Sequence, residues 1–160
     1  MKVIKAKTAG FCFGVKRAVD TVYKQVDTKC GQIYTYGPII HNEEVIKDMR
    51  DKGVIVLRSE EDLDMISQGT VIIRSHGVEK RIYEKIEQKG LRIVDATCPF
   101  VKKIHNIVSE KSGEGFHIII IGNPEHPEVV GIKGWAKDNV TVIQSAEDAE
   151  CFTADRKEKI

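Results

Sequence analysis

The chain has 160 residues, of which 41% are hydrophobic and 31% charged, and its formal net charge is +1. This composition is typical of a soluble globular protein with one ordinary domain or two small ones, and the balanced charge gives no indication of binding to nucleic acid or to an anionic membrane. The longest apolar runs, such as residues 118–121, are too short to span a bilayer, and residues 1–7 lack the apolar region of a signal peptide, so we expect a cytoplasmic protein.

The first part of the chain alternates short apolar segments with amphipathic ones. Residues 1–6 are expected to form a strand, and valines at helical spacing predict a helix over residues 14–27. Further helices are expected after Asn42 and Ser59, two residues that commonly cap helices, and over residues 79–89. The β-branched or apolar segments between these helices predict strands at residues 33–36, 54–57, 71–73 and 91–94.

The second part of the chain continues this alternation. A helix is predicted after Cys98, followed by a strand at residues 116–121 and a helix that begins at Pro127. A strand at residues 140–143 and a short helix after Ser145 complete the pattern. Because the strands are continuous apolar runs separated by helices, we predict an α/β fold of three-layer lobes with parallel sheets.

Three sequence patterns occur twice at nearly the same offset, which indicates an internal repeat. Cys12 and Cys98, 86 positions apart, both begin the pattern Cys-x-x-Val-Lys-(Lys/Arg). The other two patterns are Gly-x-x-x-His-x-Glu, at residues 37–43 and 122–128, and a strand followed by a serine, at residues 54–62 and 140–148. Chance likeness between two α/β units is the alternative, but cysteine and histidine are rare residues, which favours a true repeat.

The repeat predicts a first lobe over residues 1–97 and a second lobe over residues 98–160. The second lobe stops before the counterparts of the strands at residues 71–73 and 91–94. We therefore expect a first lobe followed by an incomplete second lobe, with the missing strands supplied from elsewhere.

Cys12 and Cys98 are candidate metal ligands. Each is expected at the start of a helix, where the helix dipole stabilises the thiolate that binds metal. Two cysteines are too few for a four-cysteine zinc site, but one thiolate from each of three repeats would suit an iron–sulfur cluster with one open iron. The alternative is that both are buried small apolar residues. Cys30 and Cys151 lie in no recognisable motif, and we interpret them as incidental.

His41, His76 and His126 each follow a predicted strand, at the end of a parallel sheet where ligands bind. Each also adjoins a helix start, where backbone N–H groups favour anions. This combination suits a small phosphorylated ligand, and the alternative is that each is an ordinary polar loop residue. The remaining two, His105 and His117, are expected in a helix and a strand, and we assign them no role.

Glu128 follows His126 at the start of a predicted helix. A carboxylic acid beside a histidine could relay protons to a bound ligand. The alternative is an ordinary first-turn glutamate favoured by the helix dipole. Its repeat partner, Glu43, lies in the same local setting, so sequence position does not separate the two.

Taken together, five motifs closely resemble the LytB/IspH family of 4-hydroxy-3-methylbut-2-enyl diphosphate reductases. They are Ala9–Val15, Gly37–Asn42, Arg74–Val78, Asp95–Pro99 and His126–Val129, in this order and across nearly the whole chain. The resemblance implies a three-lobed α/β trefoil around a [4Fe–4S] cluster. It also implies the last step of the methylerythritol phosphate route to isoprenoids, in which an allylic hydroxyl is removed reductively to give isopentenyl and dimethylallyl diphosphates.

The resemblance also implies residue roles. Cys12 and Cys98 match two of the three cluster ligands. Contacts to the diphosphate substrate are matched by His41, His76 and His126. Glu128 matches the proton donor that lets the hydroxyl leave as water. Ferredoxin or flavodoxin would deliver the electrons one at a time.

This chain departs from the family in length. Family members carry a third lobe with the third cysteine ligand and a Ser/Asn group for the diphosphate, and a threonine later in the second lobe. We therefore expect an N-terminal fragment that is inactive alone. A non-catalytic module that binds a diphosphate or a partner without a cluster is the alternative, and a zinc protein is a more remote one.

Overall fold

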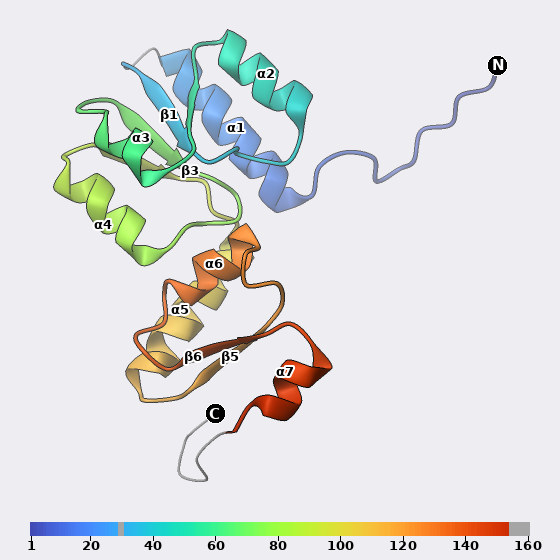
Figure 1. Cartoon of the computed structure of the whole chain (residues 1–160). Helices are drawn as coiled ribbons and strands as arrows, with labels where there is room; N and C mark the ends of the chain where they lie inside the picture. Colours follow the sequence, from blue (N-terminus) through green and yellow to red (C-terminus); the bar gives the residue numbers. More distant parts are fainter. Residues whose placement is uncertain (29–30, 154–160) are drawn as a thin grey trace.

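The computed structural model of the chain describes residues 1–28 and 31–153, which form two α/β lobes (Figure 1). The first lobe contains a four-stranded sheet in the order β2-β1-β3-β4, and the second contains β5 paired with β6. Every pair of neighbouring strands is parallel, which confirms the predicted α/β class. The strands are β1 (Ile33–Tyr36), β2 (Ile55–Leu57), β3 (Thr70–Ile73), β4 (Arg92–Asp95), β5 (Ile118–Ile121) and β6 (Val140–Ile143).

Seven helices connect or flank these strands within the described residues. They are α1 (Phe13–Thr28), α2 (Glu43–Asp51), α3 (Glu60–Asp64), α4 (Lys80–Gln88), α5 (Pro99–Gly113), α6 (Pro127–Lys133) and α7 (Ala146–Cys151). The helices α1 and α2 cover one face of the first sheet, and α3 and α4 cover the other. No helix in the described part of the chain is long and apolar enough to cross a membrane.

Strand β3 lies at the centre of the first lobe and is buried on both faces. Ile72 packs into the core beneath α1 and α2, while Val71 and Ile73 pack into the core beneath α3 and α4. A strand covered on both faces favours apolar side chains on both sides of the sheet. This preference explains why residues 71–73 form a continuous apolar run rather than an alternating one.

The capping residues predicted from the sequence begin their helices as expected. The Asn42 side chain accepts a hydrogen bond from the Val45 N–H at 3.0 Å at the start of α2. Ser145 forms a capping box at the start of α7, in which Ser145 and Asp148 bond reciprocally. Such caps satisfy N–H groups that have no partner within the helix, and they fix where the preceding loop ends.

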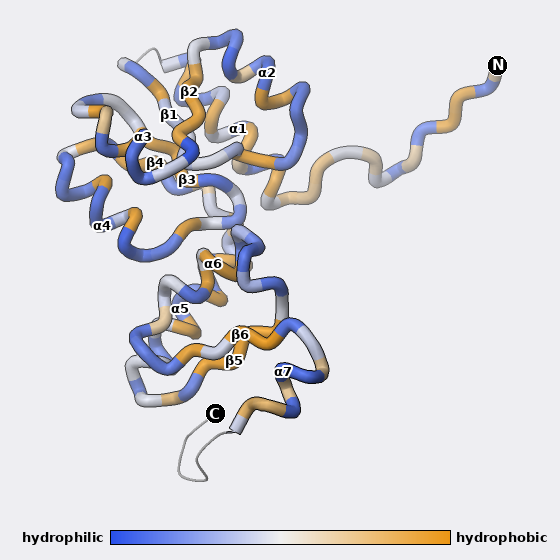
Figure 2. Tube along the Cα trace, viewed as in Figure 1, coloured by the Kyte–Doolittle hydropathy of each residue, from blue (hydrophilic) through white to orange (hydrophobic). Residues whose placement is uncertain are grey.

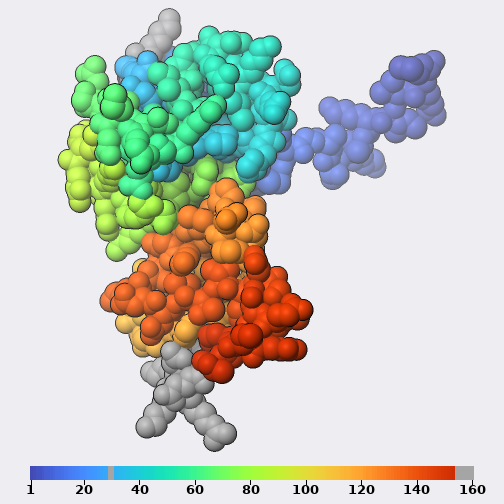
Figure 3. All heavy atoms as spheres, viewed as in Figure 1, coloured from blue at the N-terminus to red at the C-terminus, as the bar shows by residue number. Residues whose placement is uncertain are grey.

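The strand predicted at residues 1–6 is wrong. This segment extends away from the first lobe and pairs with no strand of the described chain (Figure 3). Its apolar side chains are exposed, at 80% for Val3 and 79% for Ile4. An apolar pattern makes a strand only where a neighbouring strand accepts its backbone hydrogen bonds.

The second lobe is smaller, and its two strands are largely hydrophobic (Figure 2). Ile143 is buried, but the other residues of these strands are half-buried or exposed. Ile121, the last residue of β5, is 85% exposed. By the repeat, β5 and β6 correspond to β1 and β2, and no counterparts of β3 and β4 are found in the described residues. We place the boundary between the lobes at residues 97 and 98, between β4 and α5, as a proposal.

Candidate functional site

Cys12 and Cys98 each lie at the N-terminus of a helix. The Cys12 carbonyl accepts a hydrogen bond from the Lys16 N–H at 2.9 Å as α1 begins, and the Cys98 carbonyl accepts one from Lys102 at 3.0 Å as α5 begins. Cys12 is exposed and Cys98 is half-buried. The alternative that both are buried apolar residues is therefore wrong. Cys151 is exposed at the end of α7, and Cys30 lies outside the described residues.

The Cys98 thiol lies directly against the first turn of α1. A Cβ atom added to Gly14 would be 2.7 Å from the Cys98 Sγ atom, which is closer than real Cβ contacts allow. Gly14 is two positions after Cys12, so the two cysteine loops meet at this turn. The glycine is needed for this close approach, since any larger residue would push the thiol away.

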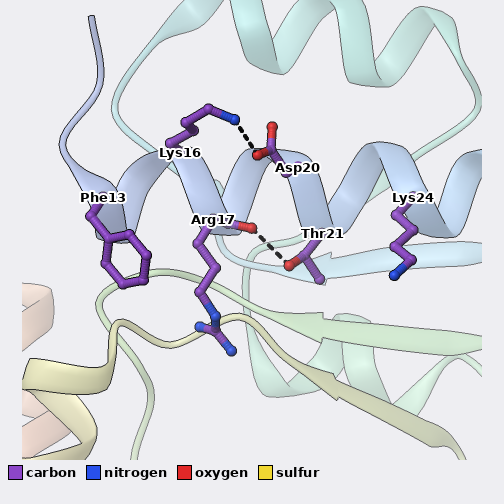
Figure 4. Close-up of a pocket in the computed structure, with 6 residues that line it drawn as sticks. All are labelled: Phe13, Lys16, Arg17, Asp20, Thr21 and Lys24. Atoms are coloured by element: carbon purple, nitrogen blue, oxygen red, sulfur yellow. Dashed lines mark hydrogen bonds and ion pairs between the residues drawn. The ribbon is translucent and has the colours of Figure 1, made fainter.

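Arg17 holds the two cysteine loops together through hydrogen bonds from α1 to the segment before Cys98. Its guanidinium donates hydrogen bonds to the carbonyl oxygens of Thr97 at 2.9 Å and Asp95 at 3.5 Å. Figure 4 shows this side chain reaching from α1 toward that segment. The six residues labelled there line a cavity of about 330 Å³ along α1, which contains none of the candidate ligands. Arg17 belongs to the repeated cysteine pattern, but that pattern did not indicate a role for its side chain.

The Asp95 carboxylate holds the Cys98 loop in shape. Its Oδ1 atom accepts a hydrogen bond from the Thr97 N–H at 2.8 Å, and its Oδ2 atom is 2.5 Å from the Lys102 Nζ atom. Burial raises the pKa of Asp95, but the hydrogen bonds from Lys102 and Thr97 outweigh burial and leave that pKa below its ordinary value. The carboxylate therefore stays ionised at neutral pH and keeps the loop anchored to α5.

His41 and His76 lie side by side at the carboxyl end of the first sheet. Their ring centroids are 5.0 Å apart, and the rings are tilted by 45°. Ser75 brings their loops together, because its Oγ atom donates a hydrogen bond to the Ile39 carbonyl at 3.1 Å. The Ser75 carbonyl in turn accepts a hydrogen bond from the Cys98 N–H at 2.9 Å. The histidine pair and the Cys98 loop are therefore joined through a single residue.

The second lobe contributes His126 and Glu128 to the same region. His126 caps α6, and its Nδ1 atom accepts a hydrogen bond from the Glu128 N–H at 3.3 Å. Burial lowers the pKa of His76, and the charges of His41 and Arg74 lower it further. Glu128 acts on the same pKa in the opposite direction, and His126 lowers it slightly. The charges of candidate residues from both lobes thus act on His76.

Arg74 adds a positive charge beside the histidine pair. Its Nε atom donates a hydrogen bond to the Gly77 carbonyl at 3.2 Å, and its guanidinium covers Gly37, where a Cβ atom would lie 2.6 Å from Nη1. Gly37 has a φ of +74°, so the turn requires glycine for its backbone as well as for space. Burial lowers the pKa of Arg74 without neutralising it. Arg74 belongs to a recognised motif, but the sequence did not indicate this position.

The donor set for a metal is incomplete in the described residues. Across residues 1–28 and 31–153, no three His, Cys, Asp or Glu side chains are grouped to hold a metal ion. Two cysteines at adjoining helix N-termini are ligands of the kind that iron–sulfur clusters use, and they are fewer than the three or four cysteines that such a cluster takes. They fall short of the four ligands of a structural zinc site.

Comparisons with known proteins agree on one family. The profile of the LytB protein family matches residues 3–160. The 4-hydroxy-3-methylbut-2-enyl diphosphate reductase of Caldanaerobacter subterraneus is 48% identical over 151 residues, which cover 94% of this chain and 52% of that protein. The enzyme of the same name from Clostridioides difficile is 43% identical over 160 residues, 99% of this chain and 56% of that protein. The chain thus spans about half the length of the curated relatives it matches.

Two solved structures share the fold. The E-1-hydroxy-2-methyl-but-2-enyl-4-diphosphate reductase from Plasmodium falciparum superposes with a TM-score of 0.88 at 31% identity and covers 96% of this chain and 48% of that one. A second structure, of (E)-4-hydroxy-3-methyl-but-2-enyl diphosphate reductase, has a TM-score of 0.77 at 39% identity, covering 91% of this chain and 52% of that one.

Proposed function

The chain belongs to the LytB protein family, and from this membership we propose that it supplies the substrate-binding and cluster-binding residues of a 4-hydroxy-3-methylbut-2-enyl diphosphate reductase. The observation that carries the proposal is the single hydrogen bond from the Cys98 N–H to the Ser75 carbonyl, one residue before His76. It joins a candidate cluster ligand to the histidines that would hold the substrate.

The diphosphate would bind where His41, His76 and His126 converge. Imidazoles donate hydrogen bonds to phosphate oxygens, and the N-termini of α2 and α6 add oriented N–H groups beside His41 and His126. Arg74 contributes a fixed positive charge. Because the binding groups come from both lobes, the ligand would span the lobe junction.

Cys12 and Cys98 would hold a [4Fe–4S] cluster together with a third cysteine from outside this chain. The cluster would supply electrons one at a time to the allylic system of the substrate, and a ferredoxin or flavodoxin would replenish them. Removal of the hydroxyl consumes two electrons and two protons and releases water. The chain's own contribution is to place the two thiolates beside the substrate pocket and to deliver a proton.

Glu128 would deliver that proton to the departing hydroxyl oxygen. The charge of Glu128 raises the pKa of His76, and Glu128 follows His126 by two residues. A carboxylic acid at hydrogen-bond distance from a leaving oxygen is suited to general acid catalysis. Glu43, in the corresponding position of the first repeat, lines a cavity of about 610 Å³ together with Arg74 and with the basic residues Lys47, Arg50 and Arg58.

The diphosphate part of the proposal is tested by the titration of His76. Saturating pyrophosphate is expected to raise the pKa of His76 from its lowered value, because a bound anion favours the imidazolium over the neutral ring. The imidazole C–H resonances of the 160-residue chain, followed by NMR against pH, measure this change. His117, which bonds to Thr141 in the second sheet, serves as the internal reference. An unchanged His76 titration at saturating pyrophosphate would contradict diphosphate binding here.

The cluster part is tested in a chimera, in which this chain replaces the matching half of the Caldanaerobacter subterraneus reductase. Gly14→Ala is expected to lower the iron bound per chain after anaerobic reconstitution, because the new Cβ atom displaces the Cys98 thiol. Gly113→Ala is the matched control, since this second helical glycine has only the Lys137 Nζ atom nearby, at 4.0 Å. Equal iron content in both variants would show that the contact between Gly14 and Cys98 does not shape the site.

A further inference from the structure

His105 is buried in α5, but its sequence context gave it no role. Its side chain is 2% exposed, and its Nε2 atom has no hydrogen-bond partner among residues 1–28 and 31–153. Burial lowers the pKa of His105 to about 4, with Asp95 opposing and Lys102 reinforcing the shift, so the ring is neutral at physiological pH. Because a polar atom that is buried without a partner adds nothing to stability, the His105 ring contributes here through its packing contacts rather than through a hydrogen bond at Nε2.

Trp135 and Tyr83 complete a stack of three rings with His105 between the lobes. The rings of His105 and Trp135 are 5.1 Å apart and nearly parallel at 18°, and Tyr83 of α4 meets the Trp135 ring edge-on at 5.7 Å. The Trp135 Nε1 atom donates a hydrogen bond to the Val78 carbonyl at 2.9 Å. The Tyr83 hydroxyl lies 3.2 Å from the Thr97 Oγ1 atom. The side chains of His105 and Trp135, both in the second lobe, thus contact the first lobe.

The His105 ring of this stack packs against the backbone of Gly77, the residue after His76. A Cβ atom on Gly77 would lie 2.5 Å from the His105 Cε1 atom and 3.1 Å from the Thr97 Cγ2 atom. Gly77 also has a φ of +71°, so glycine is favoured here by the backbone conformation as well as by the lack of space. The His105 ring is therefore in van der Waals contact with the residue that follows His76.

The same loop receives α6, which carries His126 and Glu128 at its start. A Cβ atom added to Gly131 in α6 would lie 3.8 Å from the His76 carbonyl oxygen. At the end of this helix, a Cβ atom on Gly134 would lie 2.4 Å from the side chain of Glu79. Figure 3 shows the α6 region, in orange, at the narrow junction of the two lobes. The orientation of α6 on the first lobe thus depends on how this junction is packed.

We propose that His105 and Trp135 are positioning residues for the proposed reductase. Their stack fixes the placement of α6, with His126 and Glu128, against the loop that carries His76. The expected effect on catalysis rests on the proposed function, whereas the expected effect on the orientation of the two lobes does not. A small, flat and uncharged ring fits between Trp135 and Gly77, and the Trp135 hydrogen bond to the Val78 carbonyl sets the rotation of the second lobe.

The structural consequence is measured by residual dipolar couplings, which report the relative orientation of the two sheets in the 160-residue chain. The unsubstituted chain and the His105→Phe variant are expected to give one common alignment for both lobes. His105→Ala, which removes the stacked ring, is expected to give two different alignments. Trp135→Phe keeps a ring but loses the bond to Val78, and it serves as the second test if His105→Ala does not fold. If His105→Ala folds and both of its lobes still share one alignment, the proposal is overturned. If His105→Ala does not fold, one shared alignment for both lobes of Trp135→Phe overturns it.

The catalytic consequence is measured in the chimera. His105→Ala is expected to lower kcat about 100-fold at unchanged iron content, which is the size of loss typical when a catalytic group is misplaced by about 1 Å. His105→Phe is expected to restore most of that loss. His117→Ala is the matched control, because this second-lobe histidine packs edge-on against Phe152 rather than at the junction. Equal kcat in His105→Ala and His117→Ala would overturn the positioning role. If the chimera itself is inactive, the dipolar couplings alone decide.

Discussion

Replacing Cys98 with serine in the chimera is expected to abolish cluster binding and, with it, reductase activity. A serine hydroxyl is a poor ligand for cluster iron, which selects soft thiolates. The side chains are similar in size, so the half-buried position against Gly14 and the start of α5 should be preserved. Iron per chain and visible absorption after anaerobic reconstitution measure the loss.

Cys151→Ser provides the control for this substitution. Cys151 is an exposed cysteine at the end of α7 and lies in none of the repeated patterns. The chimera with this change is expected to bind iron and turn over as the unsubstituted one does. An intact cluster in the Cys98→Ser chimera would show that the ligand assignment is wrong.

Glu128→Gln is expected to slow the chimera about 100- to 10,000-fold, the range that general acid catalysis usually contributes. Glutamine keeps the shape of the side chain but has no acidic proton to deliver. Substrate binding and iron content are expected to remain close to those of the unsubstituted chimera, because the histidines and cysteines are untouched. Turnover rates with an excess of a chemical reductant, which supplies both electrons without a protein donor, isolate the proton-transfer step from docking of that donor.

Glu43→Gln is the matched control, since both glutamates lie in the first turn of a helix and occupy the same place in the repeat. Its expected effect on turnover is small. Equal losses from the two substitutions would mean that they act through the helix dipole rather than through proton transfer.

The alternation of strands and helices could be predicted from the sequence because each element carries its own local signal. Continuous apolar runs marked β3 and β5, and Asn42 and Ser145 marked helix starts. The segment at residues 1–6 shows where this reasoning fails. Its apolar pattern is similar to that of a strand, but a strand also needs a neighbour, and pairing is a property of the fold rather than of the segment.

The candidate site could be predicted only in part, because contacts between distant segments depend on the fold rather than on the local sequence. The sequence singled out Cys12, Cys98 and the three loop histidines through the repeat and the motifs. Position in the repeat did not separate Glu128 from Glu43, and only the resemblance to the family selected Glu128. The structure adds that α6 packs against the loop of His76 and that the charge of Glu128 raises the pKa of that histidine.

The residues that hold the site together were not predictable from local patterns. Arg17 bonds to carbonyl groups 78 and 80 positions away, and Ser75 bonds to a carbonyl 36 positions away. His105 has the spacing of an ordinary helix residue, and only its contacts with Gly77 and Trp135 show its place between the lobes. Each of these roles depends on a long-range approach that no local periodicity encodes.

Turnover by the unsubstituted chimera tests the central claim most directly. The iron-loaded chimera, supplied with a chemical reductant and 4-hydroxy-3-methylbut-2-enyl diphosphate, is expected to release isopentenyl and dimethylallyl diphosphates. A folded, iron-loaded chimera that binds the substrate and yields neither product would contradict the proposed function.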